Sequence, residues 1–245
     1  MGKITVITGG TSGIGRGIAE KILAESAKED RIFVTYGHDE KKAAVFRDSL
    51  PEEKKSQVIL MKADMSSYDE MMAFVEELKK RADHIDWLVS NAGISTYAKY
   101  EDYSFEEWTR IVNTNLSVPV FMVKELRPMM VEGGSVLFTG YYAGQQAYSS
   151  SLVYGVTKAA IHFLTKSLVK EFEPKGITVN TIAPGFIQTP WHSARTQESY
   201  DRINRKIALH RFGTVEEVAD MAYAVLSNGY MNGSVVDIHG GYDYF

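Results

Sequence analysis

The chain has 245 residues, of which 44% are hydrophobic and 24% charged, so it can bury a large core beneath a soluble surface. Its 27 Lys and Arg against 31 Asp and Glu give a net charge of -4, without the basic excess typical of nucleic-acid-binding proteins. The absence of cysteine excludes disulfides, thiolate nucleophiles and cysteine-ligated metals.

Short β-branched runs alternate along the chain with longer segments of helical period. The predicted strands are Ile4–Thr8, Ile32–Tyr36, Gln57–Lys62, Trp87–Ser90, Ser135–Thr139, Thr178–Ile182 and Val235–Ile238. The predicted helices are Ile14–Glu25, Asp69–Arg81, Phe105–Leu126, Val153–Phe172 and Val215–Leu226. Strands that alternate with helices imply right-handed crossovers. We therefore expect a single α/β domain over residues 1–245, a doubly wound parallel sheet of about seven strands with helices on both faces.

The beginning of the chain and its hydropathy bear on its location. A strand that starts at Ile4 leaves no room for a signal peptide, and no apolar run approaches the roughly 20 residues that cross a bilayer. We expect a cytoplasmic protein without a membrane or nucleic-acid partner. Its six histidines show no metal-ligand spacing, so no metal site is expected.

The first predicted strand runs directly into a glycine-rich loop, Thr8-Gly9-Gly10-Thr11-Ser12-Gly13-Ile14-Gly15-Arg16, which a helix follows. Glycines let a backbone turn tightly and approach a pyrophosphate, which then lies at the positive end of the helix. The alternative is a glycine-rich turn without a ligand. The strand–loop–helix context favours a dinucleotide cofactor.

Tyr154 and Lys158 are four residues apart, and therefore share one face of a predicted helix. A tyrosine phenol has an ordinary pKa near 10. A neighbouring ammonium, together with the charge of an oxidised nicotinamide, favours the phenolate and lowers that pKa. Such a phenol can exchange a proton with a carbonyl or alcohol oxygen. The alternative is an ordinary surface pair.

These motifs resemble those of the classical short-chain dehydrogenases/reductases, including members similar to 3-ketoacyl-carrier-protein reductases. In family order and spacing, the matching segments are Thr8-Gly9-x-x-x-Gly13-x-Gly15, Asn91-Ala92-Gly93, Tyr154-x-x-x-Lys158, Asn180 and Pro184–Thr189. The resemblance covers nearly the whole chain. It implies a Rossmann-type fold and NAD(P)-dependent hydride transfer between a nicotinamide and a small-molecule carbonyl or alcohol.

The resemblance also assigns roles to residues. Tyr154 is the expected general acid/base, Lys158 also holds the nicotinamide ribose, and Asn115 supports a proton-relay water, with Asn113 as an alternative. The residues expected to contact the nucleotide are Gly9, Thr11, Ser12, Gly13, Ile14, Gly15, Tyr36, His38, Asp64, Met65, Asn91, Ala92, Gly93, Tyr154, Lys158, Pro184, Gly185, Ile187 and Thr189.

One position departs from the family pattern. The catalytic serine, which hydrogen-bonds the substrate oxygen, falls at Tyr141. Its hydroxyl can replace the serine, or the donor is Tyr142, Thr139 or one of Ser149 to Ser151. If no donor remains, catalysis is weakened. The alternative function is then an NADP-binding sensor or scaffold protein with little turnover.

The choice of cofactor depends on the end of the second strand. An acidic residue there binds the ribose 2′-hydroxyl of NAD. This chain has Thr35-Tyr36-Gly37-His38 instead, while His38, Arg16 and Lys41 or Lys42 can bind a 2′-phosphate. We expect NADP in preference to NAD.

The stretch 185–211 is the least regular one, and we expect it to be a substrate lid over the carboxyl ends of the strands. Its part after Pro190 has five basic residues (Arg195, Arg202, Arg205, Lys206 and Arg211) against Glu198 and Asp201. This excess indicates either a solvated helix face or contact with an anionic substrate group. Phe186, Trp191 and Tyr200 are candidates for an apolar wall.

Two further expectations rest on the resemblance. The helices Phe105–Leu126 and Val153–Phe172 resemble the pair that forms the family's four-helix dimer interface, and Val235–Phe245 resembles its second contact, so a homotetramer is expected. Carrier-protein reductases usually present basic residues after the fourth large helix. The segment Met129–Gly134 has none, which leaves the substrate open.

Overall fold

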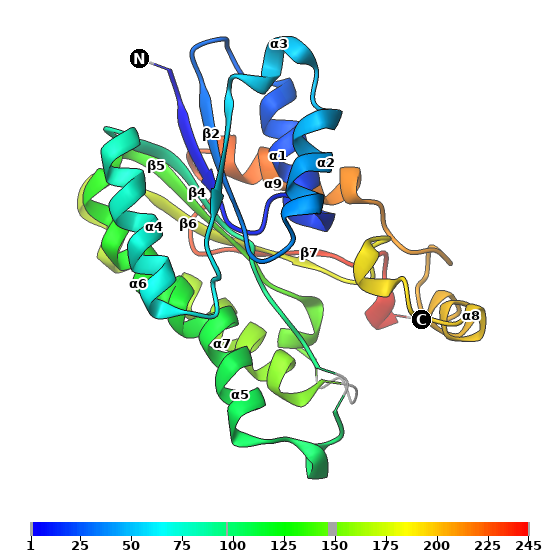
Figure 1. The fold of residues 1–245 in the computed structure, drawn as a ribbon. Coiled ribbons are helices and arrows are strands. Elements are labelled where there is room, and N and C mark those ends of the chain that lie inside the picture. Colours follow the sequence, from blue (N-terminus) through cyan, green and yellow to red (C-terminus); the bar gives the residue numbers. More distant parts are fainter. Residues whose placement is uncertain (1, 97, 147–150, 245) are drawn as a thin grey trace.

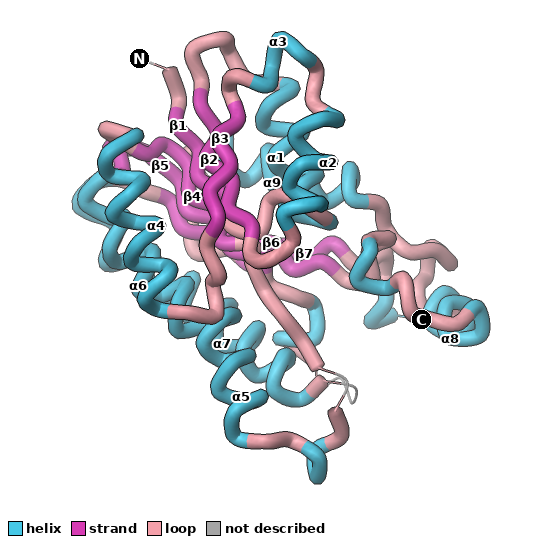
Figure 2. The backbone as a smooth tube through the Cα atoms, viewed as in Figure 1, coloured by secondary structure: helices cyan, strands magenta, loops and turns pink. Residues whose placement is uncertain are grey.

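The structure, a computed structural model, describes residues 2–96, 98–146 and 151–244. In these residues a seven-stranded parallel sheet has the order β3-β2-β1-β4-β5-β6-β7, with helices on both faces (Figures 1 and 2). The strands are β1 (Ile4–Ile7), β2 (Arg31–Tyr36), β3 (Val58–Lys62), β4 (Ile85–Ser90), β5 (Met130–Thr139), β6 (Thr178–Pro184) and β7 (Val235–Ile238). The predicted doubly wound, single-domain fold is confirmed.

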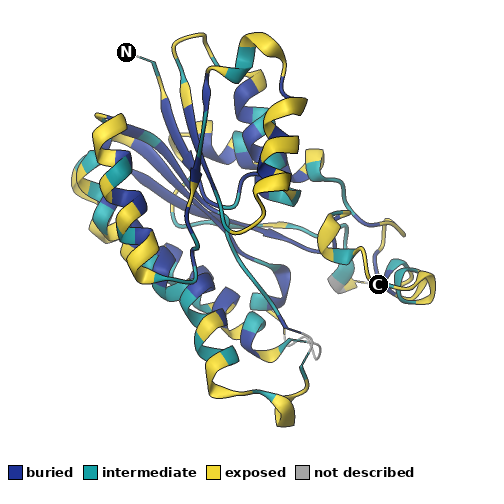
Figure 3. Cartoon of the chain, viewed as in Figure 1, coloured by how far each residue is buried: buried dark blue, intermediate teal, exposed yellow. Residues whose placement is uncertain are grey.

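Two helical layers cover the sheet, and each contributes one hydrophobic core. On one face lie α1 (Gly13–Ala24), α2 (Glu40–Ser49) and α9 (Val215–Ser227), whose apolar residues form one buried cluster. On the other lie α4 (Tyr68–Arg81), α5 (Phe105–Val112), α6 (Val118–Leu126) and α7 (Leu152–Phe172), with the larger cluster. Burial on both faces explains the continuous apolar strands: every residue of β1 and β6 is buried (Figure 3).

The strand order reverses between β1 and β4. The chain moves outward from β1 to β2 and β3, and then returns to place β4 on the other side of β1. At such a switch point the loops after the two neighbouring strands diverge, which opens a crevice at their carboxyl ends. This crevice lies where the glycine loop after β1 and the segment after β4 begin.

The predicted helix Phe105–Leu126 is not a single α-helix. Between α5 and α6 the chain makes a π-helical turn over Asn113–Ser117. Proline has no backbone N–H, so Pro119 cannot donate the usual helical hydrogen bond to the carbonyl of Asn115. The expected site residue Asn115 therefore lies in a widened turn, a geometry common at functional positions.

Three helices were absent from the sequence prediction: α2, α3 (Glu52–Lys55) and α8 (Gln197–Asn204). Each buries little. In α2 only Ala43 and Phe46 are buried, in α8 only Ile203, and in α3 no residue. Helices with so few apolar residues carry little hydrophobic signal in their sequences.

The segment 185–211 follows β6, and its two ends are joined by backbone pairing. Ile187 pairs with Gly213 in a parallel bridge, where Gln188 N donates to Gly213 O at 2.8 Å and Gly213 N to Phe186 O at 2.9 Å. A separate cluster of Phe186, Ile203, Ile207 and Phe212 fills its interior. The backbone N–H of Leu209 donates to Gly240 O, just after β7, at 3.2 Å. The segment is thus a packed unit beyond the carboxyl ends of β6 and β7.

Among the described residues, no helix combines the length and the apolar composition that a membrane crossing requires.

Candidate functional site

A cavity of about 450 Å³ lies at the carboxyl ends of β1, β4, β5 and β6. Most of the site residues predicted from the sequence line it: Gly9, Ser12, Gly13, Ile14, Gly15, His38, Asp64, Met65, Asn91, Ala92, Gly93, Tyr141, Tyr154, Lys158, Pro184, Gly185, Ile187 and Thr189. The predicted residues Thr11, Tyr36 and Asn115 are not in its wall. Residues far apart in the sequence thus meet in one chamber.

The glycine loop has the shape that a pyrophosphate requires. Gly9 and Gly13 have φ angles of +63° and +53°, in the left-handed region that favours glycine. A Cβ atom at Gly15 would collide with the carbonyl oxygen of Gly9 and with the side chain of Asn91. Helix α1 begins at Gly13 with no side-chain cap at Ser12 and no acidic residue in its first turn. Its first N–H groups therefore suit an anionic ligand, and the loop fits a dinucleotide.

Asn91 joins the ends of three neighbouring strands. Its Nδ2 donates to the carbonyl oxygens of Thr8 and Gly9, both at 3.1 Å, and its Oδ1 accepts from Thr139 Oγ1 at 3.1 Å. The Oγ1 of Thr8 in turn accepts from the backbone N–H groups of Asn91 and Ala92, each at 3.0 Å. This network holds the glycine loop against the segment after β4, and thereby fixes one side of the cavity.

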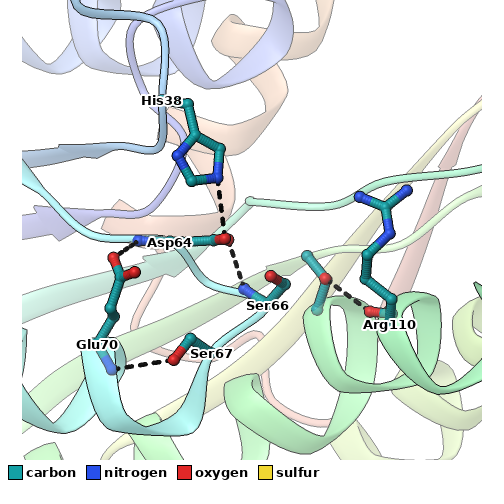
Figure 4. Close-up of polar contacts among 7 residues, drawn as sticks. His38, Asp64, Ser66, Ser67, Glu70 and Arg110 are labelled. Carbon is teal, nitrogen blue, oxygen red and sulfur yellow. Dashed lines mark hydrogen bonds and ion pairs between the residues drawn. The ribbon is translucent and has the colours of Figure 1, made fainter. Parts of the chain in front are cut away.

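At the outer end of the cavity, His38 and Asp64 form a pair that the sequence does not reveal (Figure 4). Nε2 of His38 lies 3.0 Å from Oδ2 of Asp64, while Asp64 Oδ1 accepts from Ser66 N at 2.8 Å. Partial burial opposes ionisation, but the hydrogen bonds from Ser66 and His38 outweigh it and hold the pKa of Asp64 below its ordinary value. This hydrogen bond holds the exposed His38 in the cavity wall.

Tyr154 and Lys158, both on α7, line the cavity. The Lys158 Nζ donates to Thr139 O at 2.6 Å and lies 5.3 Å from the centre of the Tyr154 ring. Burial lowers the pKa of Lys158 to about 8 and raises the pKa of the Tyr154 phenol. The spacing of Tyr154 and Lys158 in the sequence predicts a lowered phenol pKa. In the protein without nucleotide, burial opposes that lowering, so the phenol keeps its proton.

Asn115 is buried behind the cavity wall rather than in it. Its Oδ1 accepts from Ile94 N at 2.9 Å, and its Nδ2 donates to Ile94 O at 2.9 Å and to Thr157 Oγ1 at 3.1 Å. The amide thus connects the loop after β4 to α7, next to Lys158. This geometry suits a residue that positions the site.

Tyr141 lines the cavity, and its ring centre lies 5.4 Å from that of Tyr154. Of the other candidates for the serine role, Thr139 donates its hydroxyl to Asn91, and Tyr142 packs against His239 outside the cavity wall. Ser149 and Ser150 lie outside the described residues. Ser151 is in the wall, where its Oγ lies 2.7 Å from Ser95 Oγ. Of the described candidates, Thr139, Tyr141 and Ser151 line the cavity, and the ring of Tyr141 lies beside that of Tyr154.

The structure also adds wall residues that the sequence analysis missed. Ser95 and Ser66 each come shortly after a motif residue, and Arg110 and Thr114 are one helical turn apart. Arg110 is exposed on α5, and its side chain extends away from the helix (Figure 4). The four-residue spacing of Arg110 and Thr114 indicates in the sequence that they share one helix face. Spacing alone does not tell whether that face lines a cavity.

Comparison with known proteins agrees with this site. Residues 9–243 match a family model described as enoyl-(acyl carrier protein) reductase. The chain is 33% identical over 245 residues to 3-oxoacyl-(acyl-carrier-protein) reductase FabG of Chlamydia trachomatis, covering 98% of this chain and 97% of that protein. It is 30% identical over 246 residues to the FabG of Aquifex aeolicus, with the same coverage.

Solved structures show the same similarity. A short-chain dehydrogenase/reductase from Brucella melitensis, named glucose/ribitol dehydrogenase, has 29% identity and a TM-score of 0.88, covering 98% of this chain and 96% of that one. BdcA in complex with NADPH has 25% identity and a TM-score of 0.87, covering 98% and 94%. The resemblance inferred from the motifs is confirmed: the chain belongs to the short-chain dehydrogenase/reductase family, NAD(P)-dependent oxidoreductases that act on carbonyl and alcohol groups.

Proposed function

We propose that this protein reduces a ketone or aldehyde with NADPH, and that Tyr154 supplies the proton. The observation that carries the proposal is the meeting of Tyr154 and Lys158 with the glycine loop in one cavity. Bound NADPH would supply the hydride. The side chains of this chain then have to orient the carbonyl, deliver the proton and stabilise the charge that develops on its oxygen.

Each of these tasks has a residue of suitable chemistry. The Tyr154 phenol, whose pKa burial raises, retains its proton at neutral pH and can donate it to a developing alkoxide. The ammonium of Lys158 lies near enough to stabilise the phenolate that remains. Tyr141 is proposed to donate a hydrogen bond to the carbonyl oxygen in place of the family serine. Asn115 positions the loop and α7 around them.

NADP is the proposed cofactor because neither of the two cavity-wall residues that directly follow β2 is acidic. They are Gly37 and His38. His38 is exposed toward solvent on its Asp64 anchor, where its ring can meet a phosphate. The complex of BdcA with NADPH shows the nucleotide bound by a similar structure.

The test is NADPH oxidation over a panel of ketones and aldehydes, with stereospecifically 4-deuterated NADPH to trace the hydride. We expect deuterium on the carbinol carbon of the product alcohol. Tight NADPH binding without reduction of any carbonyl on the panel would contradict the proposal, and would favour the sensor or scaffold alternative.

A further inference from the structure

Two side chains of the cavity wall each carry a buried polar atom without a hydrogen-bond partner. They are Nε of Arg195 and Nδ1 of His192, which make no hydrogen bond within the described structure. Both side chains line the same cavity as Tyr154. A buried donor left unpaired is costly, and more so when it is charged. Because both side chains line the cavity and neither is fully satisfied by the described residues, this part of the wall is suited to bind a polar group of a ligand.

Arg195 is held in a fixed position. Its Nη1 donates to Ser199 Oγ at 2.8 Å, and its guanidinium lies 5.7 Å from the ring centre of Phe186. No carboxylate of the described residues forms an ion pair with it. The cation is therefore supported by a hydroxyl and an aromatic ring, and no carboxylate of the described residues neutralises its charge.

The other basic residues of the segment 185–211 do not line the cavity. Arg211 is paired with Glu217, while Arg202, Arg205 and Lys206 are exposed and outside the cavity wall. The sequence left open whether these basic residues form a solvated face or contact an anionic substrate group. Their positions in the structure differ in this respect. Most of the positive charge lies on a solvated face, and Arg195 alone of these five residues faces the cavity.

His192 complements this cation as a neutral group. Burial, assisted by the charge of Arg195, lowers the pKa of His192 to about 4, so the ring is uncharged at neutral pH. An uncharged imidazole can donate one further hydrogen bond without adding a second buried charge. Trp191 lines the same cavity, and its ring centre is 6.1 Å from that of Tyr154.

We propose that the substrate is a free oxo acid, whose carboxylate binds to Arg195 and His192 while its carbonyl lies at Tyr154. The aromatic wall of Trp191 and Phe186 covers the carbon chain between the two ends. The inference rests on the proposed function for the role of Tyr154, and it names the substrate class. A carboxylate accepts two charge-assisted hydrogen bonds from such a pair, which neutral esters and thioesters cannot match.

The test measures binding without turnover. Wild-type protein saturated with NADP⁺ cannot reduce a ketone, so calorimetry can follow oxo acids in a stable ternary complex. The ligands are acetoacetate, levulinate and 5-oxohexanoate, each with its methyl ester, and the neutral thioester acetoacetyl-N-acetylcysteamine. We expect one chain length to bind as the acid about ten-fold or more tightly than as its ester.

Two variants test whether the preference for the acid over its ester depends on Arg195. Arg195→Gln should weaken binding of that acid by about 10- to 100-fold and leave the ester within about three-fold. The matched control is Arg202→Gln, which removes an exposed charge of the same segment outside the cavity and should change neither. Equal losses for acid and ester, or an equal effect of Arg202→Gln, would overturn the proposal. An equally large loss of NADP⁺ affinity in Arg195→Gln would also overturn it, because Arg195 would then serve the cofactor.

The result also separates the two proposals. If the acid binds through Arg195 but NADPH reduces no carbonyl, the carboxylate site stands and the proposed reduction fails. If carbonyls are reduced but esters or the thioester bind as tightly as every acid, the reduction stands and the carboxylate site fails.

Discussion

The rings of Tyr141 and Tyr154 stand side by side in the cavity wall, with 5.4 Å between their centres and 59° between their planes. They come from different elements: Tyr141 follows β5, and Tyr154 lies in the first turn of α7. Because both rings border the same chamber, a substrate carbonyl that meets one phenol can meet the other.

Replacing Tyr141 by Phe tests the role of its hydroxyl while keeping the ring. We expect kcat to fall by about 10²- to 10³-fold with a small change in KM, the usual effect of losing a donor to a developing oxyanion. Tyr141→Ser, which introduces the family residue, should retain more activity toward a small ketone than Tyr141→Phe does. A Tyr141→Phe enzyme as fast as the wild type would make this residue an aromatic wall only.

Lys158→Met should stabilise the protein without nucleotide while it destroys activity. Burial lowers the pKa of Lys158 from 10.5 to about 8, which amounts to about 3 kcal/mol of disfavoured charge, partly offset by the hydrogen bond to Thr139 O. With a folded pKa below the unfolded one, this cost is fully present below pH 8 and is relieved as the pH rises toward 10.5.

Thermal unfolding of the nucleotide-free protein measures this effect. At pH 7 the variant should melt about 4 to 8 °C above the wild type, from a net gain of about 2 kcal/mol. The difference should shrink at pH 10. A lower melting temperature at pH 7 would show that the ammonium is well compensated in the fold, contrary to its lowered pKa.

Gly37→Asp should change the cofactor preference from NADPH to NADH. Gly37 lies at the end of β2 in the cavity wall, and a Cβ atom there meets no atom within 4 Å, so a side chain fits. The new carboxylate would repel a 2′-phosphate and accept a hydrogen bond from a 2′-hydroxyl. We expect NADPH to bind at least about ten-fold more weakly. Gly37→Asn, the uncharged control, should retain the preference for NADPH. Equal affinities in Gly37→Asp and the wild type would place the phosphate elsewhere.

The expected homotetramer depends on an apolar face that the single chain leaves open. Phe163 on α7 is 74% exposed and Phe105 on α5 is 78% exposed, although both are large hydrophobic residues. Such side chains on neighbouring helices are typical of a subunit interface. By light scattering, the wild type should be a tetramer at micromolar concentration, and Phe163→Glu should dissociate it at least to dimers. A monomeric wild type would refute the expectation.

The sequence predicts well those strands of the fold that are buried on both faces of the sheet. All seven strands were recognisable, because a strand buried on both faces appears as a run such as Ile4-Thr5-Val6-Ile7. The glycine loop and the Tyr154–Lys158 pair were recognisable because their spacing is fixed by local geometry. The π-turn at Asn115 was missed although its cause, Pro119, was visible, since helical periodicity alone continues through it.

Other features of the site depend on distant contacts. The pair of His38 and Asp64 joins residues that only the packing of β2 beside β3 brings together. The raised pKa of Tyr154 reflects burial, which residue spacing does not encode. The basic residues of the segment 185–211 look alike in the sequence, and the fold alone turns Arg195 into the cavity while Arg202 remains in solvent.

The central claim, proton donation by Tyr154, is tested most directly by Tyr154→Phe. The variant loses one hydroxyl, while the glycine loop that would hold the nucleotide is untouched. With NADPH and the best ketone of the panel, we predict a loss of turnover of at least about 10²-fold, since general acid catalysis contributes 10²- to 10⁴-fold. The Kd for NADPH, measured by fluorescence titration of the same sample, should remain within about three-fold of the wild type. Turnover at the wild-type rate with intact NADPH binding would contradict the account.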